Sequence, residues 1–403
     1  MDSSTSSGAA LNSTKQRLPS ERLEKANARA LAKRPFLAPD YEFTPVSVHD
    51  KDFQAIKRQY PYFGYVDVEV EGVQPFLMFS NNDDQVAQTY FWYGPDAFEN
   101  LSLRIWRELA RQSSHIFDIG AFTGVYSLTA AHANREANIY CFEPIKRIFG
   151  RLVVNLAVNT LGQRIKAYNL ALSDTDGHVN MNLSQGYLKL DTGASLIQKR
   201  GKEIVLREQI ETSRFDTFAE RHGVAGMNLV KIDVEQAEKM VIEGMLDSLR
   251  EHQPHLLVEV VSVDNLRYLS DILSPLGYHF ALIDDDDQKV HIDDLDAHTM
   301  TCNVLFSTMD ELRDFCLSFE PLAHSFDEDY ASQRYLSKGQ ILTAKLNEAN
   351  EQLKEANERN RRQAEKIRAL QDVLNAMSSS RGWKIANGIN VALTRLRRIL
   401  RRG

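Results

Sequence analysis

The chain of 403 residues has few cysteines and no long apolar run. Its three cysteines, Cys141, Cys302 and Cys316, are scattered and odd in number, so their spacing predicts neither a zinc site nor a disulfide framework. No segment approaches the roughly 20 consecutive apolar residues that a membrane-spanning helix needs. The Ser- and Thr-rich start, MDSSTSSGAALNSTKQ, lacks the apolar stretch of a secretory signal. We therefore expect a cytoplasmic protein in a reducing compartment.

The chain also lacks an excess of positive charge. Its formal net charge is -7, so the whole protein is not a generic binder of polyanions, and we expect no nucleic-acid partner. Hydrophobic residues make up 43% of the sequence, which is enough for at least one sizeable core.

A third absence is the Gly-x-Gly-x-x-Gly loop of dinucleotide-binding folds. In FDIGAFTGVYSL, Phe122 and Val125 stand where that loop needs glycine. Asp118 precedes Gly120 and would repel a pyrophosphate, but it suits a cationic amino or sulfonium group. Glu143 ends the next predicted strand, 23 residues after Gly120, where a carboxylate can accept hydrogen bonds from ribose hydroxyls. The loop therefore favours S-adenosylmethionine, which is cationic and ribosylated and has no phosphate.

What is present, from residue 93 to residue 310, is a regular alternation of strand-like and helix-like segments. This pattern predicts an α/β fold with a Rossmann-like, mostly parallel, doubly wound sheet. Ligands bind such sheets at the carboxyl ends of the strands. Five acidic residues fall at predicted strand ends: Asp118, Glu143, Asp174, Asp233 and Glu259.

Five motifs carry a resemblance to a known family. FDIGAFTGVYSL, CFEP, NLALSDTDG, VKIDVEQAE and LLVEVV occur in the order and spacing of the FkbM family of S-adenosylmethionine-dependent methyltransferases. The resemblance covers residues 93–308 and implies a class I methyltransferase fold. The chain departs from the family at Phe122, where asparagine is frequent, and at Gln236, where glycine is frequent. Neither departure removes a carboxylate, so the expected activity stands.

The resemblance also implies roles for the residues that bind the cofactor. Asp118, Gly120 and Gly124 would hold the methionine part, with Ala121 and Phe122 in the same loop and Phe122 contacting the cofactor by packing. Glu143 would bind the ribose. The adenine edge would lie beside three further residues: Asn169, Ala171 and Asp174.

A second group would face the reacting methyl group. Transfer to a sugar hydroxyl needs a base near the departing proton, and Asp233 or Glu235 would serve. Lys231 lies on the same side of the strand and would lower their pKa values or bind substrate. Glu259 would contact substrate or pair with a nearby cation. We predict no metal, although Asp233, Glu235 and Glu238 together form an alternative site for a divalent ion with oxygen ligands.

The segments around this domain differ in composition. Residues 1–40 read as a flexible arm containing a short helix, and residues 41–92 as a small N-terminal cap or β extension. Residues 311–340 read as a linker. Residues 341–378 carry a heptad seam typical of a coiled coil, which predicts a homo-oligomer. Residues 379–403 form a basic amphipathic tail, suited to the inner membrane surface or to a glycosyltransferase partner.

The sequence therefore predicts an O-methyltransferase that acts on a sugar hydroxyl in bacterial surface polysaccharide or glycolipid biosynthesis, with a glycan or glycolipid acceptor. It would be cytoplasmic, with peripheral attachment to the inner membrane through the tail. Two alternatives stay open. One is a nicotinamide-dependent oxidoreductase on the same sheet, and the other is a non-catalytic coiled-coil scaffold that retains a methyltransferase-like core.

Overall fold

The computed structural model describes residues 20–34, 51–184, 190, 204–295 and 302–319. The predicted coiled coil (341–378) and basic tail (379–403) lie outside these residues, as does most of the linker, so those predictions are not tested by the structure. Among the described residues, no helix is long and apolar enough to cross a membrane.

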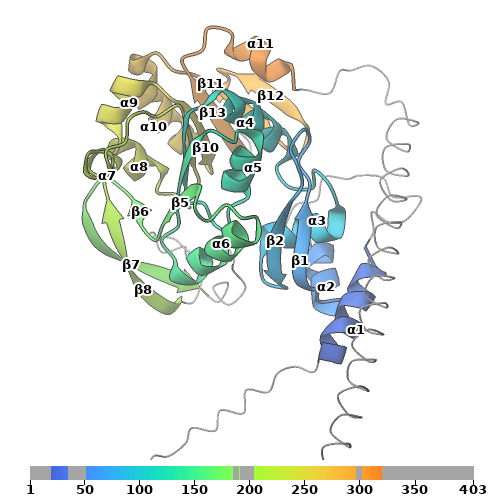
Figure 1. Cartoon of the computed structure of the whole chain (residues 1–403). Coiled ribbons are helices and arrows are strands. Elements are labelled where there is room, and N and C mark those ends of the chain that lie inside the picture. Colours follow the sequence, from blue (N-terminus) through green and yellow to red (C-terminus); the bar gives the residue numbers. More distant parts are fainter. Residues whose placement is uncertain (1–19, 35–50, 185–189, 191–203, 296–301, 320–403) are drawn as a thin grey trace, which may run out of the picture. The chain divides into compact units, whose positions relative to one another are not determined.

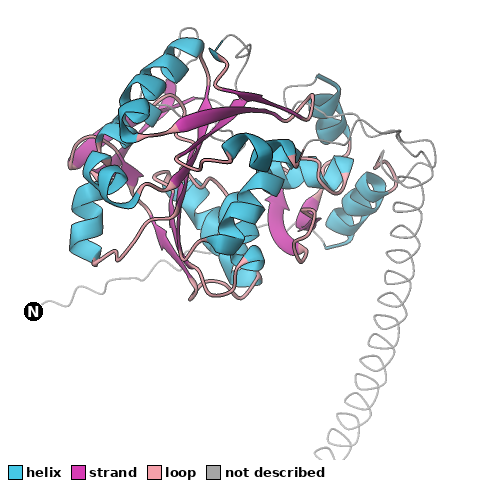
Figure 2. Ribbon diagram, turned by 90° about the horizontal axis from the view of Figure 1, so that it is seen from above, coloured by secondary structure: helices cyan, strands magenta, loops and turns pink. Residues whose placement is uncertain are grey.

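A mixed eight-stranded sheet forms the centre of the described part (Figures 1 and 2). Its strands are β3 (His115–Ile119), β4 (Asn138–Phe142), β5 (Ile165–Tyr168), β9 (Leu229–Ile232), β10 (His255–Val260), β11 (His279–Asp284), β12 (Lys289–Ile292) and β13 (Cys302–Ser307). They lie in the order β12-β11-β13-β10-β9-β3-β4-β5. The five strands from β10 to β5 are parallel, whereas β13 is antiparallel to both β10 and β11. The chain leaves β3 toward β4 and later returns to its other side at β9, which places the topological switch point between β3 and β9.

Helices cover both faces of this sheet, as expected for a doubly wound fold. One face packs against α4 (Asn100–Gln112), α5 (Val125–Ala133), α6 (Lys146–Val158) and α11 (Leu312–Leu317). The other face packs against α7 (Phe215–His222), α8 (Glu238–Glu243), α9 (Leu246–His252) and α10 (Val263–Leu273). In β3, Ile116 contributes to the first core and Phe117 to the second, because successive side chains of a strand point to opposite faces. These layers confirm the predicted α/β, Rossmann-like class.

A small N-terminal cap precedes the sheet. It contains α1 (Ser20–Leu31), α2 (Lys51–Gln59), the antiparallel hairpin of β1 (Phe63–Val68) and β2 (Phe76–Asn81), and α3 (Gln85–Tyr93). Asn155 of α6 fixes the cap, since its Oδ1 accepts from Phe79 N at 2.8 Å and its Nδ2 donates to Thr123 O at 2.8 Å. The same side chain therefore holds both β2 and the loop between β3 and α5.

A second, three-stranded sheet branches from the main one, in the order β6-β8-β7. Its strands are β6 (Ala171–Leu172), β7 (Gly177–Ser184) and β8 (Ile204–Ser213). The apolar pattern of IKAYNLALSD (165–174) predicts a single strand, and this prediction is wrong, because the segment is divided between β5 of the main sheet and β6 of the smaller one. As a result Asp174 follows β6 and not a strand of the main sheet.

The pattern of AEKMVIEGMLDSLRE (237–251) predicts one helix, which the structure also divides. It forms α8 and α9, with a break at Gly244, where an added Cβ would lie 1.9 Å from Ser173 O. The close approach of the backbone that follows β6 thus explains why residue 244 is glycine. The sequence did not reveal α3, because its residues are buried on nearly every side and show no helical alternation.

Candidate active site

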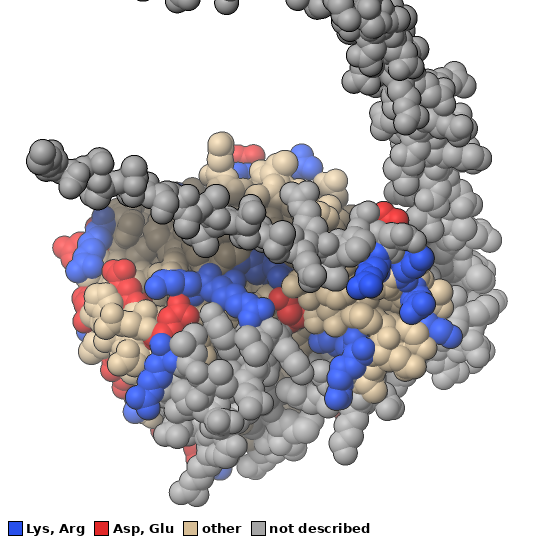
Figure 3. All heavy atoms as spheres, turned by 90° about the horizontal axis from the view of Figure 1, so that it is seen from below, with Lys and Arg blue, Asp and Glu red and all other residues tan. Residues whose placement is uncertain are grey.

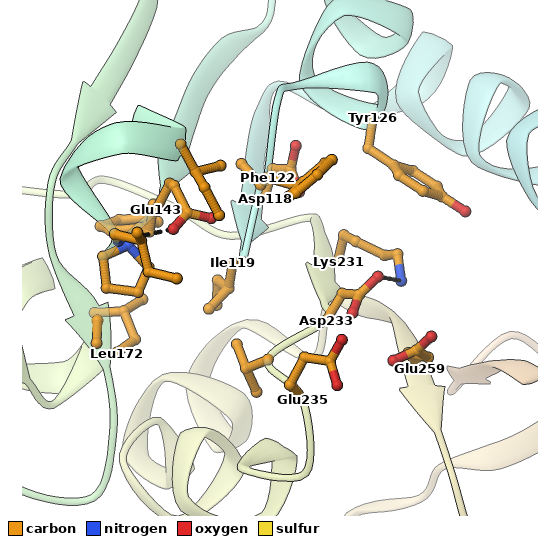
Figure 4. A pocket seen from close by; sticks show the side chains of 18 of the residues that line it. Asp118, Ile119, Phe122, Tyr126, Glu143, Leu172, Lys231, Asp233, Glu235 and Glu259 are labelled. Carbon is orange, nitrogen blue, oxygen red and sulfur yellow. Dashed lines mark hydrogen bonds and ion pairs between the residues drawn. The ribbon is translucent and has the colours of Figure 1, made fainter. Parts of the chain in front are cut away.

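A cavity of about 210 Å³ lies at the carboxyl ends of β4, β3, β9 and β10. It is lined by two groups of residues that Figure 4 separates. Glu143 and Leu172 stand at one end. Lys231, Asp233, Glu235, Glu259 and Tyr126 stand at the other, and Asp118, Ile119 and Phe122 lie between them. We call these the cofactor end and the acceptor end.

Asp118 is the buried penultimate residue of strand β3, and its side chain accepts hydrogen bonds from the first turn of helix α5. Its Oδ2 accepts from Ser127 N at 2.9 Å and from Ser127 Oγ at 2.6 Å. Burial raises the pKa of Asp118 to about 6, in spite of these bonds and of the nearby Lys231 charge. Asp118 therefore supports the fold as well as lining the cavity, so its substitution would not report on a ligand alone.

The two glycines of the loop are explained by protein atoms. Gly120 has φ +81°, and an added Cβ would lie 1.8 Å from the carbonyl oxygen of Asp233. At Gly124, with φ +100°, it would lie 2.6 Å from Leu152 Cδ1. Gly120 is thus required by the close approach of the backbone that follows β9, whereas at Gly124 the positive φ is the stronger reason, because the Leu152 side chain can move. Ala121 and Phe122 also line the cavity.

The two departures from the family pattern share one backbone feature. Phe122 has φ 48° and Gln236 has φ 78°, which are left-handed conformations that favour asparagine and glycine. By the resemblance, asparagine is frequent in the family at the first of these positions and glycine at the second. The chain therefore keeps the loop shapes while carrying less favourable residues.

Glu143 follows β4 and is nearly buried, with 5% of its surface exposed. Its Oε1 accepts from Ile145 N at 2.8 Å. Burial raises the pKa of Glu143 to about 8, against the effect of hydrogen bonds from the backbone of Ile145 and Phe122. The carboxyl group is thus held by the two loops that border the cofactor end.

Of the three residues predicted for the adenine edge, Ala171 lines the cavity, together with its neighbours Leu170 and Leu172. Asn169 instead donates to the carbonyl oxygens of Glu143 and Pro144, at 2.9 and 2.8 Å, and so supports the turn that carries Glu143. Asp174 is not among the described residues that line the cavity.

Lys231 is the centre of the acceptor end. Its side chain is 1% exposed, and its Nζ lies 3.3 Å from Asp233 Oδ2 and 2.9 Å from Asn303 Oδ1. The Nζ also lies 4.9 Å from the centre of the Tyr126 ring. Burial acts to lower the pKa of Lys231, but the carboxylates around it outweigh burial and raise it, so the lysine stays charged.

Two carboxyl groups near Lys231 hold protons more strongly than usual. The charge of Asp233 and burial raise the pKa of Glu259 well above its ordinary range. Burial raises the pKa of Glu99 to about 7, although Lys231 acts in the opposite direction. Glu259 therefore holds a proton more strongly than an ordinary glutamate, and in its protonated form it can donate a hydrogen bond.

Glu235 lines the cavity, but not through strand alternation. Strand β9 ends at Ile232, and Glu235 lies in the turn before α8 with φ 54°. Glu238 accepts from Gln236 N and Asn265 Nδ2, each at 2.9 Å, and does not line the cavity in the described part. Among the described residues, no three His, Cys, Asp or Glu side chains are grouped to hold a metal ion.

Three residues of this site were not predicted from the sequence: Glu99, Tyr126 and Asn303. The Glu99 carboxylate accepts from the Tyr126 hydroxyl and, at 3.1 Å, from Asn303 Nδ2. Asn303 lies directly opposite Glu259 in the β10–β13 pair. The sequence could have indicated Asn303 in one way. If the last strand pairs antiparallel with the strand that contains Glu259, residues near 303 reach the same edge of the sheet.

The residues present fit S-adenosylmethionine. The described cavity residues include six acidic side chains and a single cation, which is itself paired, so the cavity suits a cationic ligand. Glu143, placed after β4, stands one strand away from Asp118, and the apolar residues Ile145, Leu170 and Leu172 surround the cofactor end. An apolar wall beside a buried carboxyl group is suitable for a nucleoside.

Comparisons with known proteins identify the family of the domain that contains this cavity. Residues 118–280 match the profile of the Methyltransferase FkbM domain. The chain is 27% identical over 207 residues to 31-O-demethyl-FK506 methyltransferase FkbM of Streptomyces tacrolimicus, covering 44% of this chain and 76% of that protein. It is 26% identical over 165 residues to 2-O-methyltransferase NoeI of Sinorhizobium fredii, covering 37% and 65%. It is also 26% identical over 152 residues to Hexuronic acid methyltransferase AglP of Haloferax volcanii, covering 37% and 56%.

Among solved structures, the chain resembles a methyltransferase FkbM from Methylobacillus flagellatus KT, with 15% identity, a TM-score of 0.33 and coverage of 57% of this chain and 56% of that one. The sequence matches carry the assignment: residues 118–280 form a domain of the FkbM family of S-adenosylmethionine-dependent methyltransferases.

Proposed function

We propose that this protein is an O-methyltransferase that transfers a methyl group from S-adenosylmethionine to a sugar hydroxyl. The observation that carries the proposal is the two-ended cavity. It joins a cofactor end around Glu143 to an acceptor end in which Asp233, Lys231 and Glu259 lie together. A binding protein for the cofactor alone would not need the second group.

Asp118, Gly120, Ala121, Phe122 and Gly124 would hold the methionine part of the cofactor, and Glu143 its ribose. Ala171 would border the adenine, with Asn169 supporting the turn and Asp174 nearby. When bound, the cofactor supplies a methyl group activated by a positively charged sulfur.

The acceptor end would position and deprotonate the hydroxyl group. Asp233 is 31% exposed and held by Lys231, so it is accessible to a ligand and fixed in orientation. It would accept the proton of the attacking hydroxyl, with Glu235 as the alternative base. Glu259, whose raised pKa favours the protonated form, would donate a hydrogen bond to a second oxygen of the sugar. A positioned base of this kind contributes about 10²- to 10⁴-fold to rate.

The class of acceptor is supported by two relatives whose names specify sugar chemistry or a hydroxyl position: the 2-O-methyltransferase and the hexuronic acid methyltransferase. We extend this to a glycan or glycolipid acceptor in the biosynthesis of bacterial surface polysaccharide. Purified full-length protein incubated with methyl-labelled cofactor and a panel of glycosides tests the proposal. Label on a sugar oxygen supports it, and label on none of the sugars by a protein that binds the cofactor contradicts it.

The C-terminal segments support a separate proposal about assembly. The heptad seam of residues 341–378 would make a homo-oligomer, and the basic residues of 379–403 would bring it to the inner membrane surface or to a glycosyltransferase. Deletion of residues 379–403 should abolish sedimentation with anionic vesicles while leaving cofactor binding unchanged. Unchanged sedimentation would contradict membrane attachment through the tail.

A further inference from the structure

The buried ammonium group of Lys231 needs three partners, and the fold supplies three. Lys and Arg side chains gather in a band on the surface seen in Figure 3, where they are open to water, whereas Lys231 is 1% exposed. Its Nζ donates to Asp233 Oδ2 at 3.3 Å and to Asn303 Oδ1 at 2.9 Å. It also faces the Tyr126 ring, whose centre is 4.9 Å away. These partners account for the three donors of an ammonium group.

Asn303 joins Lys231 to a second carboxyl group. The asparagine is 4% exposed and lies in β13, directly opposite Glu259 of β10. Its Oδ1 accepts from Lys231, and its Nδ2 donates to Glu99 Oε2 at 3.1 Å. The oxygen must face the lysine, because an ammonium group only donates hydrogen bonds. The amide therefore stands between the ammonium group of Lys231 and the carboxyl group of Glu99.

Two carboxyl groups thus compete for one ammonium group. The charges of Asp233 and Glu99 both act on Lys231, but only Asp233 is in direct contact with Nζ. In Figure 4, Asp233 lies on one side of Nζ, and the Tyr126 hydroxyl, which donates to Glu99, lies on the other. A carboxyl group accepts hydrogen bonds with or without its proton. Glu99 is therefore a competitor even though burial raises its pKa to about 7.

The other acidic groups around Asn303 compete less strongly. Asp285 also receives a hydrogen bond from Asn303, but Ser102 fixes its carboxylate, from N at 2.9 Å and from Oγ at 2.5 Å. The charge of Asp233 and burial raise the pKa of Glu259, so this group holds its proton more strongly than an ordinary glutamate and attracts a cation less.

We propose that Asn303 is a positioning residue of this site, whose amide keeps the ammonium group of Lys231 on Asp233 and off Glu99. This inference rests on the proposed function, in which Asp233 is the base. Without the amide, a buried donor on Lys231 and a buried acceptor on Glu99 lose the same partner, and each can satisfy the other. Nζ would then move toward Glu99 and away from Asp233, and the base would lose its fixed orientation.

Asn303→Leu in the full-length protein tests this role, because it removes the amide and nearly keeps the size of the side chain. The crystal structure of the variant should place Nζ of Lys231 within hydrogen-bond distance of a Glu99 oxygen and no longer beside Asp233. Rates are measured with methyl-labelled cofactor and the best acceptor among methyl glucoside, methyl galactoside and methyl mannoside. We expect kcat to fall about tenfold or more. Acceptor KM and affinity for S-adenosylhomocysteine should change by less than about threefold, because Asn303 is not among the described residues that line the cavity.

A second substitution should rescue the first. Glu99→Met, added to Asn303→Leu, removes the competing carboxyl group, so Nζ should return to Asp233 and kcat should rise about threefold or more above that of Asn303→Leu. A residue that only supports the fold would show a further loss instead.

Asn228→Leu is the matched control for loss of an amide. Asn228 precedes β9, the strand of Lys231, at its opposite end, and its Oδ1 accepts from Ser114 N at 3.1 Å and His115 N at 3.0 Å. This variant should lower the free energy of unfolding and leave kcat unchanged. Asn303→Ala makes the same test as Asn303→Leu if the leucine variant does not fold.

The outcomes separate the inference from the function beneath it. A folded Asn303→Leu protein in which Nζ stays beside Asp233 contradicts the positioning role, as does a loss of kcat that Glu99→Met does not reverse or that Asn228→Leu matches. Transfer to none of the three glycosides by a protein that binds the cofactor contradicts the proposed function. The crystal structures need no acceptor, so they decide the place of Lys231 in that case as well.

Discussion

The two ends of the cavity are built from different parts of the chain. At the cofactor end, the polar groups are bound to loops next to them in sequence: Glu143 to Ile145, and Asp118 to Ser127. At the acceptor end, Glu99, Tyr126, Lys231 and Asn303 come from segments up to 204 residues apart. The cofactor end is thus a local product of strand–loop–helix units, and the acceptor end is a tertiary product of the whole described fold.

This difference suggests how the family domain can serve a particular acceptor. The parts that hold the cofactor lie within the matched residues 118–280. The acceptor end also draws on α3, on the start of α4 and on β13, which lie outside that range. Substitutions at the acceptor end should therefore change kcat or the KM for the acceptor and leave cofactor affinity in place. Substitutions at the cofactor end should change cofactor affinity.

The largest expected effect is that of Asp233→Asn. Loss of the base should reduce kcat by about 10²- to 10⁴-fold. Affinity for S-adenosylhomocysteine should change by less than about threefold, because Asp233 belongs to the acceptor end. Rates with labelled cofactor and calorimetric titration measure the two quantities. An equal loss of kcat and of affinity for S-adenosylhomocysteine would show that the two ends do not act separately.

Lys231→Met should have the next largest effect, on stability. The substitution leaves Asp233 without its buried partner and removes the cation near Glu99 and Glu259. Breaking such a pair costs about 3 kcal/mol in the free energy of unfolding. Lys289→Met is the control, since Lys289 is 61% exposed and its pair with Asp287 should contribute less than about 1 kcal/mol. Denaturant unfolding that gave equal losses for the two variants would contradict the central place of Lys231.

Asn155→Ala tests the support that the two ends share. The side chain is buried and bonds both Phe79 N and Thr123 O, so its loss leaves two backbone groups without those partners, at a cost of about 2 kcal/mol. Both cofactor affinity and acceptor KM should weaken severalfold, unlike in the single-ended variants. The exposed Asn138→Ala should be close to wild type. A change in cofactor affinity alone, or in acceptor KM alone, would mean that the cap and the loop are held independently.

The smallest effect is a pH dependence of stability from the cofactor end. Burial raises the pKa of Glu143 from its ordinary value of 4.5 to about 8 in the folded state. The folded state therefore binds more protons between these values, so the stability from this group is complete below pH 4.5 and is lost as pH rises through about 8. Glu143→Gln should make the free energy of unfolding fall less steeply with pH over that range. Thermal unfolding from pH 5 to pH 9 measures it, and identical slopes for the variant and wild type would refute the buried, protonated state.

The sequence allowed prediction of the acidic residues that directly follow or end strands, at both ends of the cavity, because their positions depend on local rules. Strand alternation and the carboxyl-end rule placed Asp118, Glu143, Asp233 and Glu259 at one sheet edge, and the structure brings all four to the cavity. The rules failed where a strand was divided, so Asp174 was expected at the main sheet but follows β6 of the smaller one.

The acceptor end was only partly predictable, for a physical reason. Glu99 lies outside any strand, and its orientation depends on a left-handed backbone and on two distant partners. Tyr126 reads as an ordinary apolar residue of helix α5, and Asn303 reaches the site only through the register of β13 against β10. None of these contacts has a signature in sequence spacing, because each depends on how separate elements pack.

Calorimetric titration of three proteins with S-adenosylhomocysteine tests the central claim most directly: wild type, Glu143→Ala and Glu99→Gln. The two-ended cavity predicts binding to wild type, a loss of at least about tenfold in affinity for Glu143→Ala, and wild-type affinity for Glu99→Gln. Equal losses in both variants would contradict the division of the cavity. Absence of binding to folded wild-type protein would contradict the cofactor site itself and favour a non-catalytic scaffold.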